Sequence, residues 1–102
     1  MSTSKEYYNY IEEQLSHLGD ISYRAMMGEY VVYYHGKVVG GIYDDRLLIK
    51  VTDGAKKVLG DITLETPYDG AKPMLLVDDI ENQEKMKKLF DVTYLELPDK
   101  KK

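Results

Sequence analysis

One segment, residues 28 to 51, constrains the fold of this chain more than any other. It reads GEYVVYYHGKVVGGIYDDRLLIKV, and its runs of valine, tyrosine and isoleucine, which are common in strands, are separated by the pairs His35–Gly36 and Asp44–Asp45. Glycine and aspartate are typical of the two-residue loops that close tight β-hairpins. The segment therefore predicts a three-stranded antiparallel meander with two hairpin turns.

The patterns before the meander indicate a helix and an extended stretch. Over residues 3–18, Thr3 and Glu6 have the spacing of a capping box, and apolar residues recur at three- and four-residue steps, so we expect a helix. Residues 21–27 alternate only weakly between apolar and polar side chains and read as a short extended stretch. The meander is therefore entered from an N-terminal helix.

Three further elements are predicted after the meander. A cap at Thr52 or Asp53 begins a short helix, and the apolar residues 74–77 suit a buried strand. A last helix, capped by Asp78 or Asp79, keeps helical apolar spacing toward the C-terminus. The predicted order is α-β-β-β-α-β-α. It indicates a two-layer α+β domain, in which an antiparallel sheet, the three-stranded meander plus additional strands, is packed by helices.

The length and composition are typical of one globular domain. The chain has 102 residues, 43% hydrophobic and 31% charged, and we expect a single domain over residues 1–102 with its core in residues 5–98. The basic run at residues 99–102 is predicted to be a solvated tail. There is no cysteine, which excludes disulfides and thiolate chemistry. Without an apolar leader or a run of about 18 apolar residues, we expect a cytoplasmic protein with no membrane partner.

The sequence contains no motif that points to catalysis. Phosphate-binding and dinucleotide-binding glycine patterns are absent, and His17 and His35 lie where a helix end and a turn are predicted. The acidic pairs Asp44–Asp45 and Asp78–Asp79 have the chemistry to hold a divalent cation, although turn formation and helix capping explain them more simply. We therefore predict no catalytic residue, no metal site and no cofactor, and expect that the protein is not an enzyme.

The register of the hairpins separates the meander into two faces. With two-residue loops, one face is almost wholly apolar and is expected to lie against helices. The other face mixes tyrosine and valine with basic side chains, as half-exposed contact surfaces do. The residues predicted to bind a partner on this second face are Tyr30, Tyr34, Tyr43, Arg46 and Lys50.

Several uses of this second face remain open. It is either an ordinary solvated sheet face or a docking surface for a protein partner or a second copy of the chain. Aromatic and basic side chains on a sheet also suit a nucleic-acid-binding adaptor, but a net charge of −4 disfavours direct nucleic-acid binding. A small-molecule-binding or metal-dependent enzyme, which needs a deep pocket with convergent polar groups, is the alternative from a different class.

Several motifs occur in an order that is shared with a known family. They are YRAMMGEYVVYYHGKVVGGIYDDRLLIKV, then PYDGAKP, then MLLVDD. Among their marks are Arg24, the Met27–Gly28 pair, the aromatic Tyr30 and the run at residues 44–50. In these features the chain resembles the N-terminal domain of the TfoX/Sxy family of competence regulators, from about residue 5 to residue 98.

The resemblance implies a two-layer α+β domain with an antiparallel sheet. Longer members carry a second, helical C-terminal domain and act in bacterial regulation of DNA uptake, as coactivators of a transcription factor such as the cyclic-AMP receptor protein. We expect this chain to end where that second domain would begin. The family brings no established catalytic residues. The resemblance therefore implies a non-catalytic regulatory domain whose partner is a protein, such as a transcription factor, or a second copy of itself.

Overall fold

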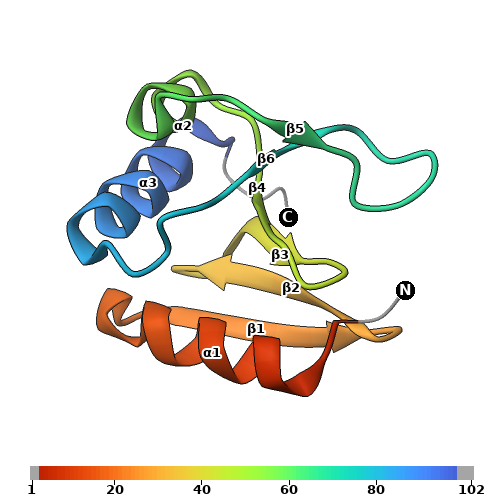
Figure 1. Cartoon of the computed structure of the whole chain (residues 1–102). Helices are drawn as coiled ribbons and strands as arrows, with labels where there is room; N and C mark the ends of the chain where they lie inside the picture. Colours follow the sequence, from red (N-terminus) through yellow and green to blue (C-terminus); the bar gives the residue numbers. More distant parts are fainter. Residues whose placement is uncertain (1–2, 99–102) are drawn as a thin grey trace.

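The computed structural model describes residues 3–98, in which an antiparallel sheet is packed by helices (Figure 1). Within these residues the sheet has six strands in the order β1-β2-β3-β4-β6-β5. The strands are β1 (Ile21–Met26), β2 (Glu29–Tyr34), β3 (Lys37–Ile42), β4 (Leu47–Ile49), β5 (Leu64–Glu65) and β6 (Met74–Leu76). The helices are α1 (Lys5–Leu15), the short 3₁₀ helix η1 (Ser16–Leu18), α2 (Asp53–Leu59) and α3 (Gln83–Glu96). The predicted α+β class is confirmed.

The helices cover one face of the sheet and form the main core with it. Figure 1 shows α1 lying along β1, while α2 and α3 pack against each other at the other end of the molecule. Each helix contributes buried apolar side chains to a core that also contains one face of β2, β3, β4 and β6. The fully buried members from the helices are Ile11, Leu15, Ala55, Met86 and Leu89.

Two of the predicted helix caps are wrong. The N-cap of α1 is Ser4, whose hydroxyl accepts a hydrogen bond from the Tyr7 amide, whereas Thr3 is buried and donates its hydroxyl to the Glu29 carboxylate. The N-cap of α3 is Asn82, and neither predicted aspartate caps that helix. Asp79 has φ 55°, a left-handed conformation that belongs to the turn before the helix. The prediction for α2 is confirmed, because Thr52 caps it.

Tight turns join the first four strands, and both predicted turns are present. The central pairs His35–Gly36 and Asp44–Asp45 have positive φ at both positions, as do Met27 and Gly28 between β1 and β2. Positive φ at both central residues defines the type I′ turn, whose twist matches that of a hairpin. The strand pairs β1–β2, β2–β3 and β3–β4 are therefore consecutive hairpins.

The pairing of β2 with β3 contains one irregularity. Tyr33 pairs with Val38. The preceding residue, Val32, pairs with Gly40, which leaves Val39 as one extra residue in β3. An extra residue of this kind exchanges the faces of the strands beyond it, because side chains alternate with a period of two residues.

This β-bulge overturns the predicted faces of the first hairpin. The prediction that Tyr30 and Tyr34 share the uncovered face with Tyr43 is wrong, because both tyrosines point toward the helices. The second hairpin has no such irregularity, and the side chains of Leu47 and Ile49 are buried against the helices as predicted.

The opposite face of the sheet, which we call the open face, carries none of the helices in the described part of the chain. A line of paired residues, Val31, Gly41 and Leu48, crosses β2, β3 and β4 on this side. Val31 and Leu48 are buried but lie outside the core that the helices build. The long connection between β5 and β6 supplies the side chains that border this face further along.

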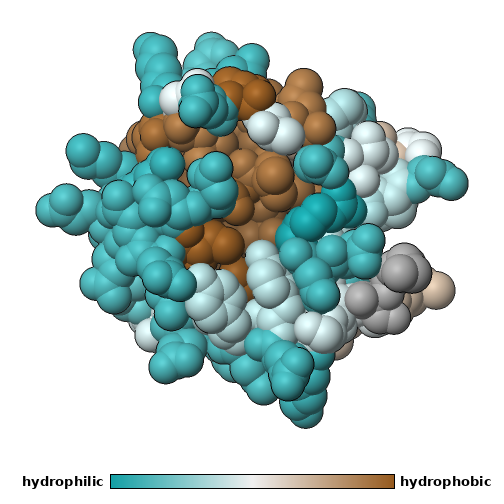
Figure 2. Space-filling model, viewed as in Figure 1, coloured by the Kyte–Doolittle hydropathy of each residue, from teal (hydrophilic) through white to brown (hydrophobic). Residues whose placement is uncertain are grey.

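The helix side is also not fully covered. Figure 2, viewed as in Figure 1, shows apolar surface gathered over β4 and β6 and bordered by hydrophilic side chains. Ile62 and Leu64, at the β5 end of the sheet, are 43% and 55% exposed. The three helices therefore leave the β5–β6 end of their face partly open to solvent.

Candidate protein-interaction groove

The open face carries two hollows that meet at a pair of tyrosines. Tyr43 and Tyr68 line both hollows, and their ring centroids lie 6.2 Å apart with the rings inclined at 62°. The first, which we call the lysine hollow, has a volume of about 450 Å³, and the second, the methionine hollow, has about 470 Å³. Together they form the open-face groove, which is the candidate functional site.

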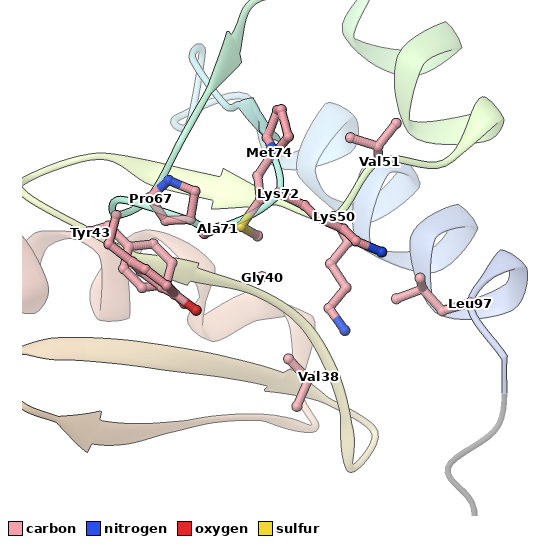
Figure 3. Close-up of a pocket in the computed structure, with 12 residues that line it drawn as sticks. Val38, Gly40, Tyr43, Lys50, Val51, Pro67, Ala71, Lys72, Met74 and Leu97 are labelled. Atoms are coloured by element: carbon pink, nitrogen blue, oxygen red, sulfur yellow. The ribbon is translucent and has the colours of Figure 1, made fainter.

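The lysine hollow lies between β3, the end of β4 and the β5–β6 connection. In Figure 3, Tyr43 lies at one end of the hollow and Leu97 at the other, with the Lys50 side chain extending between them. Its walls are largely apolar, and its other lining residues include Val38, Val51, Pro67, Ala71, Lys72, Pro73 and Met74. The hollow is therefore an apolar channel with cationic groups in its wall.

The methionine hollow lies beside the turn between β1 and β2. Met26 and Met27 line it together with Glu29, Tyr30 and Val31. The Met27 side chain is 98% exposed, and that of Met26 is 52% exposed. Methionine is flexible and polarisable, so it fits irregular apolar partners well.

Local geometry explains why Tyr43 can lie flat on the sheet. A Cβ atom built on Gly41 would lie 2.5 Å from a ring carbon of Tyr43, so only glycine leaves room for the ring. Burial raises the pKa of the Tyr43 hydroxyl above its ordinary value, and the neighbouring Tyr68 and Glu29 raise that pKa further. The hydroxyl is therefore protonated at neutral pH and available as a hydrogen-bond donor.

Arg46 holds the border of the groove in place. Its guanidinium forms an ion pair with Glu65 of β5 and donates from Nε to the backbone oxygen of Tyr43. Both contacts are partly buried. Arg46 therefore ties the β3–β4 turn to β5 and positions Tyr43.

Lys50 and Lys72 differ from Arg46 because, among residues 3–98, no acidic side chain shares the lysine hollow with them. Of the charged residues in the described part of the chain, only these two lysines line the lysine hollow. Within residues 3–98, neither side chain forms a hydrogen bond or an ion pair with the protein. Both groups are therefore solvated and able to meet an anion from outside.

The five sequence-predicted contact residues are only partly brought together. Tyr43 and Lys50 line the lysine hollow, and Arg46 lies at its border. Tyr30 lines the methionine hollow, but its ring stacks on Tyr8 of α1 with centroids 4.0 Å apart.

Tyr34 belongs to the core rather than to the groove. It is 0% exposed and packs edge-on against Phe90, with ring centroids 5.7 Å apart. Its hydroxyl donates to the Asp91 carboxylate at 2.6 Å and accepts from the Lys87 ammonium at 3.1 Å. A direct contact between Tyr34 and a partner is therefore incompatible with the fold.

Sequence reasoning missed four groove residues, Met26, Met27, Tyr68 and Lys72. Tyr68 and Lys72 belong to PYDGAKP, a segment whose prolines and glycine indicate only a turn-rich connection. A signal for Met27 was available, because a methionine in a two-residue hairpin turn points its side chain into solvent. A large apolar side chain at such a position is unusual for framework alone.

The other candidate chemistry is dispersed. Among residues 3–98, no group of three or more histidine, aspartate or glutamate side chains is arranged to hold a metal ion. His35 lies in its turn with Nδ1 3.2 Å from the Asp20 carboxylate. The described part of the chain has no helix with the length and apolar character needed to cross a membrane. What the groove offers is apolar and aromatic contact area, the hydroxyl groups of Tyr43 and Tyr68, the ammonium groups of Lys50 and Lys72, and the carboxylate of Glu29 in the methionine hollow.

Comparison with known proteins adds a family and one relative. The TfoX N-terminal domain family model matches residues 13–99. The chain is also similar to an uncharacterized 12.7 kDa protein from the region 5′ of trpE in Spirochaeta aurantia. The two are 32% identical over 99 residues, which cover 96% of this chain and 86% of the relative.

Proposed function

The chain belongs to the TfoX N-terminal domain family, and from this premise we propose that it is a non-catalytic regulatory module that binds another protein through the open-face groove. The family is associated with competence regulation and is not a known enzyme family. We place the module in the cytoplasm, and its partner in the class of transcription regulators. Its regulatory effect then comes from binding rather than from a reaction.

One observation carries the proposal. The groove concentrates large apolar side chains that the fold leaves in solvent, with Met27 98% and Tyr68 63% exposed. Exposing such side chains next to each other is unfavourable in water unless a partner covers them. Aromatic side chains and methionine are also the residues enriched at the centres of protein interfaces. The groove therefore has the composition of an interface core.

The experiment compares capture by the wild-type chain with capture by a groove variant. The double variant Tyr68→Ser, Met27→Ser removes exposed apolar contact area from both hollows and leaves the core intact. Leu95→Ser is the matched control, because Leu95 is 75% exposed and lies outside both hollows. Each tagged protein is used to capture partners from an extract of the source organism, and captured proteins are quantified by mass spectrometry.

We expect wild type and the Leu95→Ser variant to retain the same partner, and the groove variant to lose it by about tenfold or more, as is usual when interface anchors are truncated. Circular dichroism confirms that all three proteins are folded. Solution mass measured alongside shows whether the partner is a second copy of the chain. Equal capture by all three proteins would contradict the proposal.

A further inference from the structure

We propose that the segment bound in the groove is an acidic and apolar peptide, whose carboxylates are held by Lys50 and Lys72. The inference rests on the proposed function and adds the chemistry of the partner. It also assigns each half of the peptide to one of the two hollows. The apolar side chains of the peptide occupy the methionine hollow, and its acidic end occupies the lysine hollow.

The charge of the lysine hollow differs from that of the whole chain. The whole chain has 18 acidic and 14 basic residues and a net charge of −4, so its surface as a whole repels an acidic partner. The lysine hollow has the opposite character, because among residues 3–98 two lysines and no acidic residue line it. An acidic segment is therefore attracted to this hollow and disfavoured over most of the remaining surface.

Lys50 and Lys72 also differ from other lysines of the chain, which form ion pairs. Lys85 and Lys87 have their ammonium groups 3.6 Å and 3.4 Å from aspartate carboxylates. Lys50 and Lys72 make no such contact within residues 3–98. A carboxylate that enters the hollow therefore gains its partners without breaking an existing ion pair.

The shape and polarity of the lysine hollow suit a peptide better than a small ligand. Its two lysines are set among apolar side chains such as Val38, Met74 and the 40%-exposed Val51. A small ligand usually binds in a cavity that encloses most of its surface. The lysine hollow is instead open to solvent and continues past Tyr43 and Tyr68 into the second hollow. A channel of this kind suits a chain segment that presents several side chains in succession.

The different linings of the two hollows determine which half of the segment each hollow binds. Within the described residues, the methionine hollow has no lysine or arginine in its lining and contains the acidic Glu29, so it disfavours a carboxylate. The Tyr43–Tyr68 pair separates it from the lysine hollow, and aromatic rings accept apolar side chains on their faces. Apolar anchors on one side and acidic groups on the other therefore match the groove.

The test uses two fluorescein-labelled peptides of roughly twelve residues and measures their binding to the full chain by fluorescence anisotropy. Both contain the same leucines in one half, and the other half contains either glutamates or glutamines. We expect the glutamate peptide to bind about tenfold more tightly at low salt, and the difference to shrink as salt screens the charges. The double variant Lys50→Glu, Lys72→Glu should lose this preference.

The matched control is Lys5→Glu, Lys88→Glu, which makes the same change in net charge at two exposed lysines outside both hollows. This control should keep most of the preference for the glutamate peptide. Equal binding of the two peptides to wild type, equal losses in both charge variants, or no binding of either peptide up to about 1 mM would overturn the inference. A preference for a labelled single-stranded oligonucleotide over the glutamate peptide would overturn it as well.

These results are distinguishable from failure of the proposed function. If Tyr68→Ser, Met27→Ser abolishes partner capture while the lysine variants leave it intact, the groove binds its partner without using the two ammonium groups. In that case the proposed function stands and the inference falls. If the lysine variants also fail to fold, as judged by circular dichroism, the single variants Lys50→Gln and Lys72→Gln are compared with wild type in the same assay.

Discussion

The tyrosine hydroxyl groups of this protein have different surroundings, and these show whether a given tyrosine supports the fold or faces the groove. Tyr34 places its hydroxyl between a carboxylate and an ammonium group in the core. Tyr43 lies across the bare backbone of Gly41 and keeps its hydroxyl at the groove. In contrast, the hydroxyl of Tyr23 is buried and has no hydrogen-bond partner among residues 3–98. Of these three tyrosines, only Tyr43 lines the groove, while the hydroxyls of Tyr23 and Tyr34 are enclosed by the fold.

Replacing Tyr23 by phenylalanine should stabilise the protein by about 1 kcal/mol at pH 7, because it removes a polar group that is buried without a partner. The matched control is Tyr34→Phe, the same chemical change at a hydroxyl that has two partners. We expect the control to destabilise the protein by about 1–2 kcal/mol. Urea denaturation followed by far-ultraviolet circular dichroism measures both free energies of unfolding. A destabilising effect of Tyr23→Phe would show that this hydroxyl does have a favourable interaction.

At the scale of elements, turns are more predictable from sequence than strand register. A type I′ turn needs residues that tolerate positive φ, so His35–Gly36 and Asp44–Asp45 can be recognised from residue type alone. The bulge at Val39 leaves no such signature, because valine is an ordinary strand residue and the extra residue depends on how β3 packs. The next position does show a constraint, since a Cβ atom on Gly40 would lie 2.2 Å from the Leu48 backbone oxygen.

The difference between predictable turns and unpredictable strand register also limits how much of the candidate site can be predicted from the sequence. Tyr43 and Lys50 belong to the second hairpin, whose strand register is regular. Their place in the groove could therefore be inferred from the alternation of side chains between the two faces of the sheet. Tyr34 precedes the first hairpin turn, where a single extra residue reverses the assignment of faces. Tyr68 and Lys72 lie on a connection whose position on the sheet depends on tertiary packing, which local sequence patterns do not encode.

One side chain of the meander supports the end of the last helix. The ammonium group of Lys37 donates to the backbone oxygens of Tyr94 and Leu97 and lies 4.3 Å from the Tyr94 ring centroid. The last carbonyl groups of a helix lack intrahelical partners, and a cation near them is favourable. Lys37 therefore couples β3 to the C-terminal end of α3.

Substituting Lys37→Met should destabilise the protein by about 1–2 kcal/mol, because it removes charge-assisted hydrogen bonds that are partly buried. Lys88→Met, at an exposed position of α3, is the control and should change stability by less than about 0.5 kcal/mol. Urea denaturation gives the stability, and amide hydrogen exchange should show faster exchange in the last turn of α3 only for Lys37→Met. Equal stability of the two variants would mean that the helix end does not depend on the lysine.

At the scale of the whole molecule, the fold raises the pKa of tyrosine hydroxyls in several different elements. Burial is the largest cause of a raised pKa for most of the tyrosines whose pKa departs from the ordinary value, while a hydrogen bond to Glu81 is the largest cause for Tyr10. These residues come from α1, β1, β2 and the β3–β4 turn, and they are Tyr7, Tyr8, Tyr10, Tyr23, Tyr34 and Tyr43. The folded state therefore binds these protons more tightly than the unfolded chain does.

The sign of the resulting pH dependence follows from linkage. A tyrosine whose pKa is raised in the folded state stabilises folding fully below the unfolded pKa of about 10, and this contribution is lost as pH rises through the folded pKa. The hydrogen bond from Lys87 to the Tyr34 hydroxyl raises the pKa of that lysine as well, so its contribution is lost in the same direction. Stability should therefore decline steeply above about pH 10 without a matching decline between pH 7 and 9 from these groups.

The prediction is checked by measuring the urea midpoint from pH 7 to about pH 11.5 and by following tyrosinate absorbance near 295 nm over the same range. We expect most of the tyrosinate signal to appear together with the loss of circular dichroism, because ionisation of the buried hydroxyls is coupled to unfolding. Tyr23→Phe removes one of the coupled groups, so its midpoint should fall less steeply above pH 10 than that of wild type. Complete tyrosine ionisation near pH 10 in a protein that remains folded would show that the hydroxyls are solvated and that burial does not hold their protons.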